Sequence, residues 1–279
     1  MALVGKPHIS FSELMDWTLC PHYHWLKHVL QVGSDPGSIH TAFGTAVHEA
    51  IEAILLEETL ARHEGEDWEY TPIHDANFDR LFQQEVQKLI QDEIEVDQEL
   101  VMEMRKQGEN LLPEVVPALR EAFPGFELVA TEMQLYELMP GTQKKFKGFV
   151  DLVIKHEGRF VILDWKTCRN GWPPRQKSST RKVYQLALYQ HFSCQKEGWS
   201  PEETRAFFAL LKREGKPGRR VEIFEVSVKK KRKENALKLL RKAVYNIERS
   251  FHIKDWRGCK HKDRFGVCPF METEHCRRR

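Results

Sequence analysis

The chain has 279 residues, of which 41% are hydrophobic and 30% are charged. This composition excludes collagen-like, fibrous and disordered chains, and the length fits one large domain or two small ones. No apolar run approaches the roughly 18 residues of a transmembrane helix, and the first residues lack a signal-peptide pattern, so we expect a cytoplasmic protein. Six cysteines in such a chain indicate free thiols or metal ligands rather than a disulfide framework.

The net charge of +2 hides an uneven distribution along the chain. Residues 49–139 contain 23 acidic and 6 basic side chains, a balance of −17, whereas residues 205–279 contain 23 basic and 9 acidic side chains, a balance of +14. A basic C-terminal third is typical of proteins that bind a polyanion, with nucleic acid as the first candidate. The alternative is that the two parts offset each other within the fold.

The first half of the chain is predicted to be mainly helical. Ser10 to Glu13 form a capping box ahead of a short helix that ends before Cys20-Pro21. Apolar residues at helical spacing predict a helix over 41–59, and a second, acidic helical region covers 75–120 with interruptions near Pro113 and Pro117. We expect residues 57–124 to be a helical insertion within a single domain spanning 1–279.

The second half alternates strands and helices. Predicted strands cover 126–138, two segments of 146–166 around a turn at 156–159, 205–212 and 221–228, and a polar loop covers 170–180. Helices are predicted over 181–195 and, with a strongly basic start at Lys229 to Lys233, over 229–251. The fold class is therefore α/β or α+β, with mixed strands and flanking helices.

The predicted hairpin places carboxylates together. With the turn centred on Glu157-Gly158, paired residues have numbers that add up to 315, so Asp151 lies opposite Asp164 with Cβ atoms roughly 5 Å apart. Lys166 returns to the same face two residues later. Two adjacent carboxylates repel each other unless a cation lies between them, and paired hard oxygen ligands suit Mg²⁺ or Mn²⁺. The alternative is a pair of ordinary strand-end charges, one of them bound to Lys166.

These motifs together resemble the PD-(D/E)XK nuclease superfamily, and its RecB-like branch in particular. Gly148-x-x-Asp151 and Asp164-x-Lys166 match the nuclease motif, Gly44-x-x-x-His48 matches a helical motif with a metal-binding histidine, and Gln185-x-x-x-Tyr189 matches a motif of the branch. Taken alone, His48 would be read as a partly buried polar residue and the Gln185–Tyr189 pair as surface residues. Their order along the chain favours the nuclease reading.

The resemblance implies a restriction-endonuclease-like core and assigns roles to these residues. His48, Asp151 and Asp164 would bind Mg²⁺ or Mn²⁺, Lys166 would position or activate a water molecule, and Gln185 and Tyr189 would hold the nucleic acid beside the scissile phosphate. Glu132 lies where the family often has an acidic residue. Gly44 would allow a close approach of backbone or ligand to the helix of His48.

The cysteines resemble those of RecB-like enzymes with a 4Fe-4S cluster, such as AddB, CRISPR adaptation nucleases and exonuclease V. Cys20, Cys259 and Cys268 match cluster positions, but Lys262 replaces the remaining cysteine and cannot act as a thiolate ligand. We expect Cys276 to supply the fourth ligand, in a clamp that joins Cys20 to residues 256–279. A zinc site that uses His261 or His275, or no metal, are the alternatives. Cys168 and Cys194 are expected to be structural thiols.

The predicted function is a metal-dependent DNA nuclease, in the first place an exonuclease on single strands or DNA ends. Lys229 to Lys233 and the three C-terminal arginines are expected to contact phosphates. No G-x-x-x-x-G-K-[ST] motif is present, so any helicase motor would be another chain. The rival is a non-catalytic nucleic-acid-binding subunit of a recombination or CRISPR adaptation complex. A zinc-binding module would leave the hairpin unexplained.

Overall fold

The computed structural model describes residues 5–33, 37–260 and 267–277. In this part of the chain, no helix is long and apolar enough to cross a membrane. The α-helices are α1 (Phe11–Leu19), α2 (Pro21–His24), α3 (Ile39–Glu64), α4 (Pro72–Gln91), α5 (Gln98–Leu111), α6 (Val115–Ala122), α7 (Pro174–Lys177), α8 (Thr180–Glu197) and α9 (Lys230–Glu248). The strands are β1 (His8–Ser10), β2 (Glu127–Leu138), β3 (Lys145–His156), β4 (Arg159–Cys168), β5 (Thr204–Lys212) and β6 (Val221–Glu225).

The six strands form one mixed sheet in the order β1-β3-β4-β5-β6, with β2 also paired to β3. β1 pairs in parallel with the beginning of β3, and β4 pairs antiparallel with its end, so both lie on the edge of β3 opposite β2. β4 and β5 are parallel and are connected through α8, whereas β6 returns antiparallel to β5. Between the segments that pair with β1 and β4, one edge of β3 is left without a partner strand.

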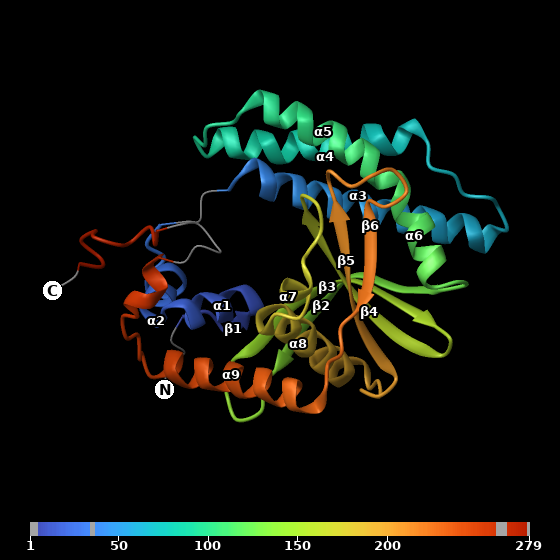
Figure 1. Ribbon diagram of the computed structural model, residues 1–279. Helices are drawn as coiled ribbons and strands as arrows, with labels where there is room; N and C mark the ends of the chain where they lie inside the picture. Colours follow the sequence, from blue (N-terminus) through green and yellow to red (C-terminus); the bar gives the residue numbers. More distant parts are fainter. Residues whose placement is uncertain (1–4, 34–36, 261–266, 278–279) are drawn as a thin grey trace.

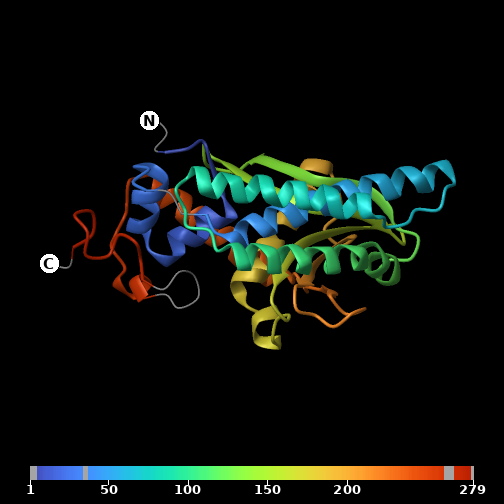
Figure 2. The same ribbon diagram turned by 90° about the horizontal axis from the view of Figure 1, so that it is seen from above.

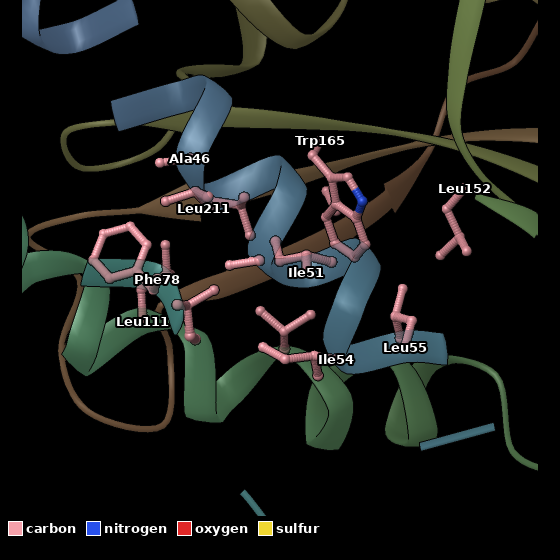
Figure 3. Close-up of a cluster of buried hydrophobic side chains, with 14 of the residues drawn as sticks. Ala46, Ile51, Ile54, Leu55, Phe78, Leu111, Leu152, Trp165 and Leu211 are labelled. Carbon is pink, nitrogen blue, oxygen red and sulfur yellow. The ribbon is translucent and has the colours of Figure 1, made fainter. Parts of the chain in front are cut away.

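Helices cover both faces of the sheet, as Figure 1 shows. The layer of α3 to α6 packs on one face through Trp165, Leu152, Leu211 and the apolar residues of α3 (Figure 3). The other face packs against α1, α8 and α9. The predicted α/β architecture with a central mixed sheet flanked by helices is therefore confirmed.

The acidic region of 75–120 contains more breaks than its sequence predicts. The chain leaves the helix between α4 and α5, at residues 92–97, where Glu93 adopts a positive φ of 59°. A 3-10 turn marks Pro113, as predicted, but Pro117 lies in the first turn of α6, where a missing N–H breaks no helical bond. The helices α3 to α6 share one apolar core with the sheet. The boundaries of a helical insertion at 57–124 stay a prediction.

Two short elements and one helix cap differ from the sequence-based expectation. β1 is a three-residue strand with no periodicity to detect, and the predicted polar loop contains α7, which begins with a proline at its first helical position. The capping box at α1 is half formed. Ser10 accepts a hydrogen bond from the Glu13 N–H at 3.2 Å, but the buried Glu13 carboxylate binds His24 at 2.8 Å instead of closing the box.

Candidate active site

The carboxylate hairpin forms with the predicted register. Leu152 pairs with Leu163 and His156 with Arg159, and both pairs add up to 315. The ladder between β3 and β4 ends at Leu152, the residue after Asp151 in the chain. At Asp151 the carboxylate replaces the next ladder bond, because its Oδ2 accepts a hydrogen bond of 2.7 Å from the Trp165 backbone N–H. The end of the ladder therefore leaves a backbone N–H that anchors the carboxylate.

Asp164 is held tightly by two neighbours. It is 1% exposed, and its Oδ2 forms an ion pair with the Lys166 ammonium on the same face of β4. Its Oδ1 accepts a hydrogen bond of 2.8 Å from the Gln185 side-chain amide on α8. The structure therefore brings Asp151, Asp164 and Lys166 together at the point where β4 leaves β3.

Gln185 and Tyr189 line the cleft and also contact each other and the protein around them. The Gln185 amide lies 3.4 Å from the Tyr189 hydroxyl, one helical turn away, and Tyr189 is only 8% exposed. A Cβ at Gly148 would lie 3.0 Å from the Tyr189 ring, so the glycine of the motif leaves room for this tyrosine. Gln185 thus orients Asp164, a contact that the i,i+4 spacing alone did not predict.

His48 on α3 and Glu132 on β2 lie beside Asp151. One ligand-type atom each from His48, Glu132 and Asp151 lie within 4.8 Å of one another, and His48 Nδ1 is 3.7 Å from Asp151 Oδ2. Glu132, which sequence reasoning noted but left out of the metal ligands, lies between Thr131 and Met133, whose partners on β3 are Leu152 and Val150. This register places Glu132 beside Asp151. The signal available in the sequence was only an acidic residue where the family often has one, because the pairing of β2 with β3 was not predicted.

Two backbone features distinguish the ligand positions. Glu132 has a φ of +45°, a left-handed conformation that costs about 1–2 kcal/mol for a non-glycine residue in the middle of a strand. Gly44, in contrast, adopts no special conformation, and an added Cβ would meet only the Thr167 hydroxyl at 3.6 Å, an ordinary contact. No described residue therefore approaches the Gly44 backbone unusually closely.

Burial and mutual repulsion shape the protonation of these groups. Burial, and then the charge of Asp164, raises the pKa of Asp151 well above its ordinary value. Burial also raises the pKa of Asp164, although Lys166 opposes this change. Burial alone would lower the pKa of Lys166, but Asp164 and Asp151 outweigh it and raise the pKa, so the amine stays charged. Burial and Lys166 lower the pKa of His48 to about 4, which keeps the imidazole neutral.

The donor set fits a divalent cation. Two carboxylates and a neutral imidazole converge on one point, and the carboxylates destabilise each other without a cation beside them. Oxygen donors suit Mg²⁺ and Mn²⁺, and the imidazole is also compatible with the softer of the two. The group found by geometry contains Glu132, whereas Asp164 faces Lys166 and Gln185.

A cleft of about 1690 Å³ surrounds these residues. Its lining includes the carboxylates of β2 to β4, Glu49 and Glu52 of α3, and two groups of basic residues, which we call the cleft walls. One group, Lys6 and Lys147, comes from the segment before β1 and from β3, and the other, Arg175, Arg181 and Lys182, comes from α7 and α8. The Lys182 ammonium lies 3.4 Å from the centre of the Trp172 ring.

The basic start of α9 does not line this cleft. Residues 229–233 are absent from its lining, and Lys233 is close enough to Glu202 to influence the pKa of that carboxyl. Glu202 precedes β5, whereas Asp164 pairs with Phe208 in the middle of that strand. The sequence-independent phosphate contacts expected of this segment therefore stay a prediction, and they would lie outside the cleft. The last two arginines lie outside the described residues.

The cysteines bring the two ends of the chain together, and both views show the C-terminal segment beside α2 (Figures 1 and 2). Cys20, Cys259 and Cys276 are buried, and the Cys268 N–H donates to the Cys259 carbonyl at 2.9 Å. Burial, and then the nearby thiols of Cys20 and Cys276, raise the pKa of Cys268. The Asp255 N–H donates to Cys20 Sγ at 3.3 Å.

All six cysteines are free thiols. The Cys20, Cys268 and Cys276 thiols are near enough to influence one another. Among the described residues, however, the group of ligand atoms found within 4.8 Å of one another is that of His48, Glu132 and Asp151 and contains no cysteine. Cys194 donates to the Thr204 hydroxyl at 3.4 Å on the other side of the core, consistent with a structural thiol. Lys262 and His261, which bear on the choice of ligands, lie outside the described residues.

Comparison with known proteins identifies the family of the chain. The PD-(D/E)XK nuclease superfamily matches residues 8–278. A crystal structure titled as a "putative exonuclease" from Eubacterium rectale is similar in fold, with a TM-score of 0.56 and 15% identity over 89% of this chain and 84% of that chain. The chain SSO0001 covers 71% of this chain at 11% identity, but its TM-score of 0.31 carries no argument.

No curated protein matches the sequence closely enough to inform the assignment. At 15% identity, the Eubacterium rectale structure supports the fold alone. The family match covers nearly the whole chain and includes the carboxylate hairpin, the lysine and the helices that surround them. The protein therefore belongs to the PD-(D/E)XK nuclease superfamily.

Proposed function

We propose that the protein is a divalent-metal-dependent deoxyribonuclease that hydrolyses phosphodiester bonds in single strands or at DNA ends. The observation that carries the proposal is the convergence of Asp151, Asp164 and Lys166 on one cleft, beside the His48–Glu132 pair. The family membership supports phosphodiester hydrolysis, and the basic cleft walls suit a polyanionic substrate.

In this proposal, His48, Asp151 and Glu132 hold the metal ion, and Asp164 lies beside it. When bound, Mg²⁺ or Mn²⁺ lowers the pKa of a water molecule and neutralises charge on the phosphate. Lys166, kept charged by Asp164, faces the same cleft and stabilises the negative charge that develops on the phosphate oxygens. Gln185 fixes the orientation of Asp164 through its hydrogen bond.

Tyr189 supports the position of Gln185 in this proposal, because its ring packs on Gly148 and its hydroxyl lies near Gln185. Both side chains line the cleft, where they would hold the nucleic acid beside the scissile phosphate. The basic residues of the cleft walls, Lys147, Arg175 and Arg181 among them, would contact further phosphates.

We further propose that Cys20, Cys259, Cys268 and Cys276 bind a 4Fe-4S cluster, with zinc as the alternative. The burial of Cys20, Cys259 and Cys276 and the proximity of Cys20, Cys268 and Cys276 support the proposal. The role of the metal would be structural, since it would join the N-terminal and C-terminal segments. A helicase, or a recombination or CRISPR adaptation protein, is the proposed partner.

Product analysis tests the proposed function. Linear and circular DNA, single-stranded and duplex and labelled at either end, would be incubated with the protein and Mg²⁺, Mn²⁺ or EDTA. We expect metal-dependent release of short products from linear single strands, with circular molecules resistant. Cleavage of circles would assign an endonuclease instead. Binding without any cleavage in either metal would favour a non-catalytic subunit.

A further inference from the structure

We propose that the exposed face formed by β1, β2 and β3 is a track along which a single nucleic-acid strand lies as it enters the active site. The track consists of His8, Gln134, Tyr136, Lys145, Lys147 and Phe149. The inference rests on the proposed nuclease function and deepens it, because it identifies a single strand as the substrate and names the residues that select it.

The alternation of the strands defines this face. On β3, Phe146, Gly148 and Val150 are buried, so the odd-numbered residues from 145 to 149 point to the opposite side. On β2, Met133 and Leu135 are buried, which turns the even-numbered residues outward. Register then aligns them: Gln134 pairs with Phe149, Tyr136 with Lys147, and His8 on β1 with Lys145.

Aromatic rings and ammonium groups alternate on this face. The Lys145 ammonium lies 4.4 Å from the centre of the Tyr136 ring, the Lys147 ammonium lies 5.7 Å from the Phe149 ring, and His8 contacts Tyr136 edge-on with ring centres 5.8 Å apart. Phe149 is 40% exposed, which is unfavourable for a phenyl ring without a partner. Aromatic rings interleaved with cations are the pattern of sequence-tolerant single-strand binding surfaces.

The track runs directly into the active site. Phe149 precedes Asp151 by two residues on β3, and Lys6, His8, Lys147 and Phe149 line the same cleft as the carboxylates. From Lys145 to Asp151 the strand advances about 20 Å, with like-facing side chains about 6.7 Å apart. That repeat suits the unstacked nucleotides of an extended strand, whereas stacked bases in a duplex repeat every ~3.4 Å.

Charge identifies the occupant of the face. None of the six track residues is acidic, and Lys6 adds a further cation in the cleft. The one carboxylate of the cleft lining near His8 is that of Glu13, which is buried and bound to His24, whereas Glu49 and Glu52 lie near Glu132 at the active-site end. A polyanion therefore complements the face along its length, and its scissile phosphate would reach the carboxylates only where a metal ion can bind. An acidic peptide would match the charge, but it would not stack on the two rings.

Binding measurements without cleavage test the track. Fluorescence anisotropy in EDTA would compare a labelled mixed-sequence oligonucleotide with a hairpin duplex of the same length. Phe149→Ala and Tyr136→Ala should each weaken single-strand binding about five- to hundred-fold, with a smaller effect on the duplex. Phe149→Leu should lose as much as Phe149→Ala, and Phe149→Trp should retain affinity. These substitutions are on the surface, and the melting temperature of each variant would verify folding.

The salt dependence of binding separates contacts between lysines and phosphates from stacking of bases on aromatic rings. Lys145→Ala/Lys147→Ala should lower the slope of log Kobs against log salt by about 1.4, at about 0.7 for each of two phosphates, whereas Phe149→Ala should leave the slope unchanged. Matched controls are Tyr245→Ala, a ring covered by Arg249 on α9, and Lys106→Ala/Lys216→Ala on exposed positions. Both controls should stay within twofold of the wild type.

The outcomes distinguish this inference from the proposed function. If the track variants bind single strands as tightly as the controls do, the track is wrong, even where the wild-type protein cleaves DNA in Mg²⁺ or Mn²⁺. If the track variants lose binding as expected but the wild-type protein cleaves nothing, the track stands and the catalytic proposal fails. An equal loss of single-strand and duplex binding would also overturn the track, because it would remove the selectivity.

Discussion

The Asp151 carboxylate stabilises the hairpin and destabilises the metal-free protein at the same time. It accepts the Trp165 N–H, but burial and Asp164 raise its pKa. A carboxyl with a raised pKa in the folded state penalises folding at pH values above its unfolded pKa near ~4, and the penalty disappears below it.

Asp151→Asn should therefore stabilise the metal-free protein at pH 7 to 8 while abolishing cleavage, because asparagine can still accept the Trp165 N–H. We expect a rise of a few degrees, since ~1 kcal/mol shifts the melting temperature by about 2–4 °C for a domain of 150–250 residues. The rise should vanish as the pH falls towards about 4. Thermal unfolding in EDTA across pH checks this, with Asp67→Asn on the surface as the control. An unchanged or lower melting temperature at pH 8 would contradict the assigned pKa shift.

Lys166→Ala separates catalysis from metal binding. It should slow cleavage by a factor of about 10² to 10⁴, because the amine stabilises the negative charge that develops on the phosphate oxygens during the reaction. Affinity for Mn²⁺ should be equal or higher, since a like charge beside the ion is removed. Single-turnover cleavage and calorimetric titration with Mn²⁺ measure the two effects, and Lys106→Ala is the control. A parallel loss of metal affinity would assign Lys166 a structural role instead.

At this scale, the sequence was informative where strand pairing determines geometry. The turn at Glu157-Gly158 fixes the register, and the register places Asp151 near Asp164. The contact between Gln185 and Asp164 depends on how α8 packs across the sheet, which no local pattern encodes. Glu132 was visible as an acidic residue, but its left-handed backbone and its approach to His48 arise from the tertiary structure.

At the scale of elements, long amphipathic segments were predicted well and short ones were not. The alternation of β3 and β4 and the apolar spacing of α3 are strong signals, because each buries a complete face. β1 has three residues and α7 has four, too few for a periodic pattern, and both depend on neighbouring elements for their stability. Charge alone did not locate the active site, since the basic start of α9 does not line the cleft.

Two pairs of basic residues, one on the cleft wall and one at the start of α9, can be compared directly. Arg175→Glu/Arg181→Glu, on the cleft wall, should weaken DNA binding and reduce the salt slope by about one or more per residue. Lys230→Glu/Lys231→Glu, with the same change of charge at the start of α9, should have a clearly smaller effect on both. Anisotropy titrations at several salt concentrations measure this difference. A larger effect of the α9 variant would show that nucleic acid follows a different path.

At the scale of the whole molecule, the fold joins segments from opposite ends of the chain. Cys20 lies near Cys268 and Cys276, so the N-terminal and C-terminal segments are neighbours in the fold. The metal clamp that the cysteine spacing predicts stays a proposal, because two of the residues that bear on its ligands, His261 and Lys262, lie outside the described structure. The acidic helical region of residues 75–120 and the basic C-terminal third are also in direct contact, because Arg220 forms an ion pair with Glu114.

The proposed iron–sulfur cluster at the cysteines predicts the metal content and the thermal stability of the protein. Protein purified anaerobically should be brown and contain iron and acid-labile sulfide in near-equal amounts. Cys20→Ala and Cys276→Ala should lose the colour and lower the melting temperature, because a metal that closes so long a loop is coupled to folding. Cys168→Ala, a thiol of β4, is the matched control.

Full iron content in Cys276→Ala would remove Cys276 from the ligand set. Colourless protein with stoichiometric zinc after iron-supplemented anaerobic expression would favour the zinc alternative. Iron and sulfide analysis together with thermal unfolding distinguishes these cases.

The most direct test of the assigned catalytic centre is metal-dependent cleavage by Asp164→Ala. This carboxylate forms the ion pair with Lys166 and lies beside the proposed metal ligands, so its loss should disable the centre while the substrate-binding walls remain. With linear single-stranded DNA and Mn²⁺, the wild-type protein should release products, and the variant should bind DNA normally but cleave no faster than the EDTA background. Cleavage by the purified variant within tenfold of the wild-type rate would contradict the assignment of the active site.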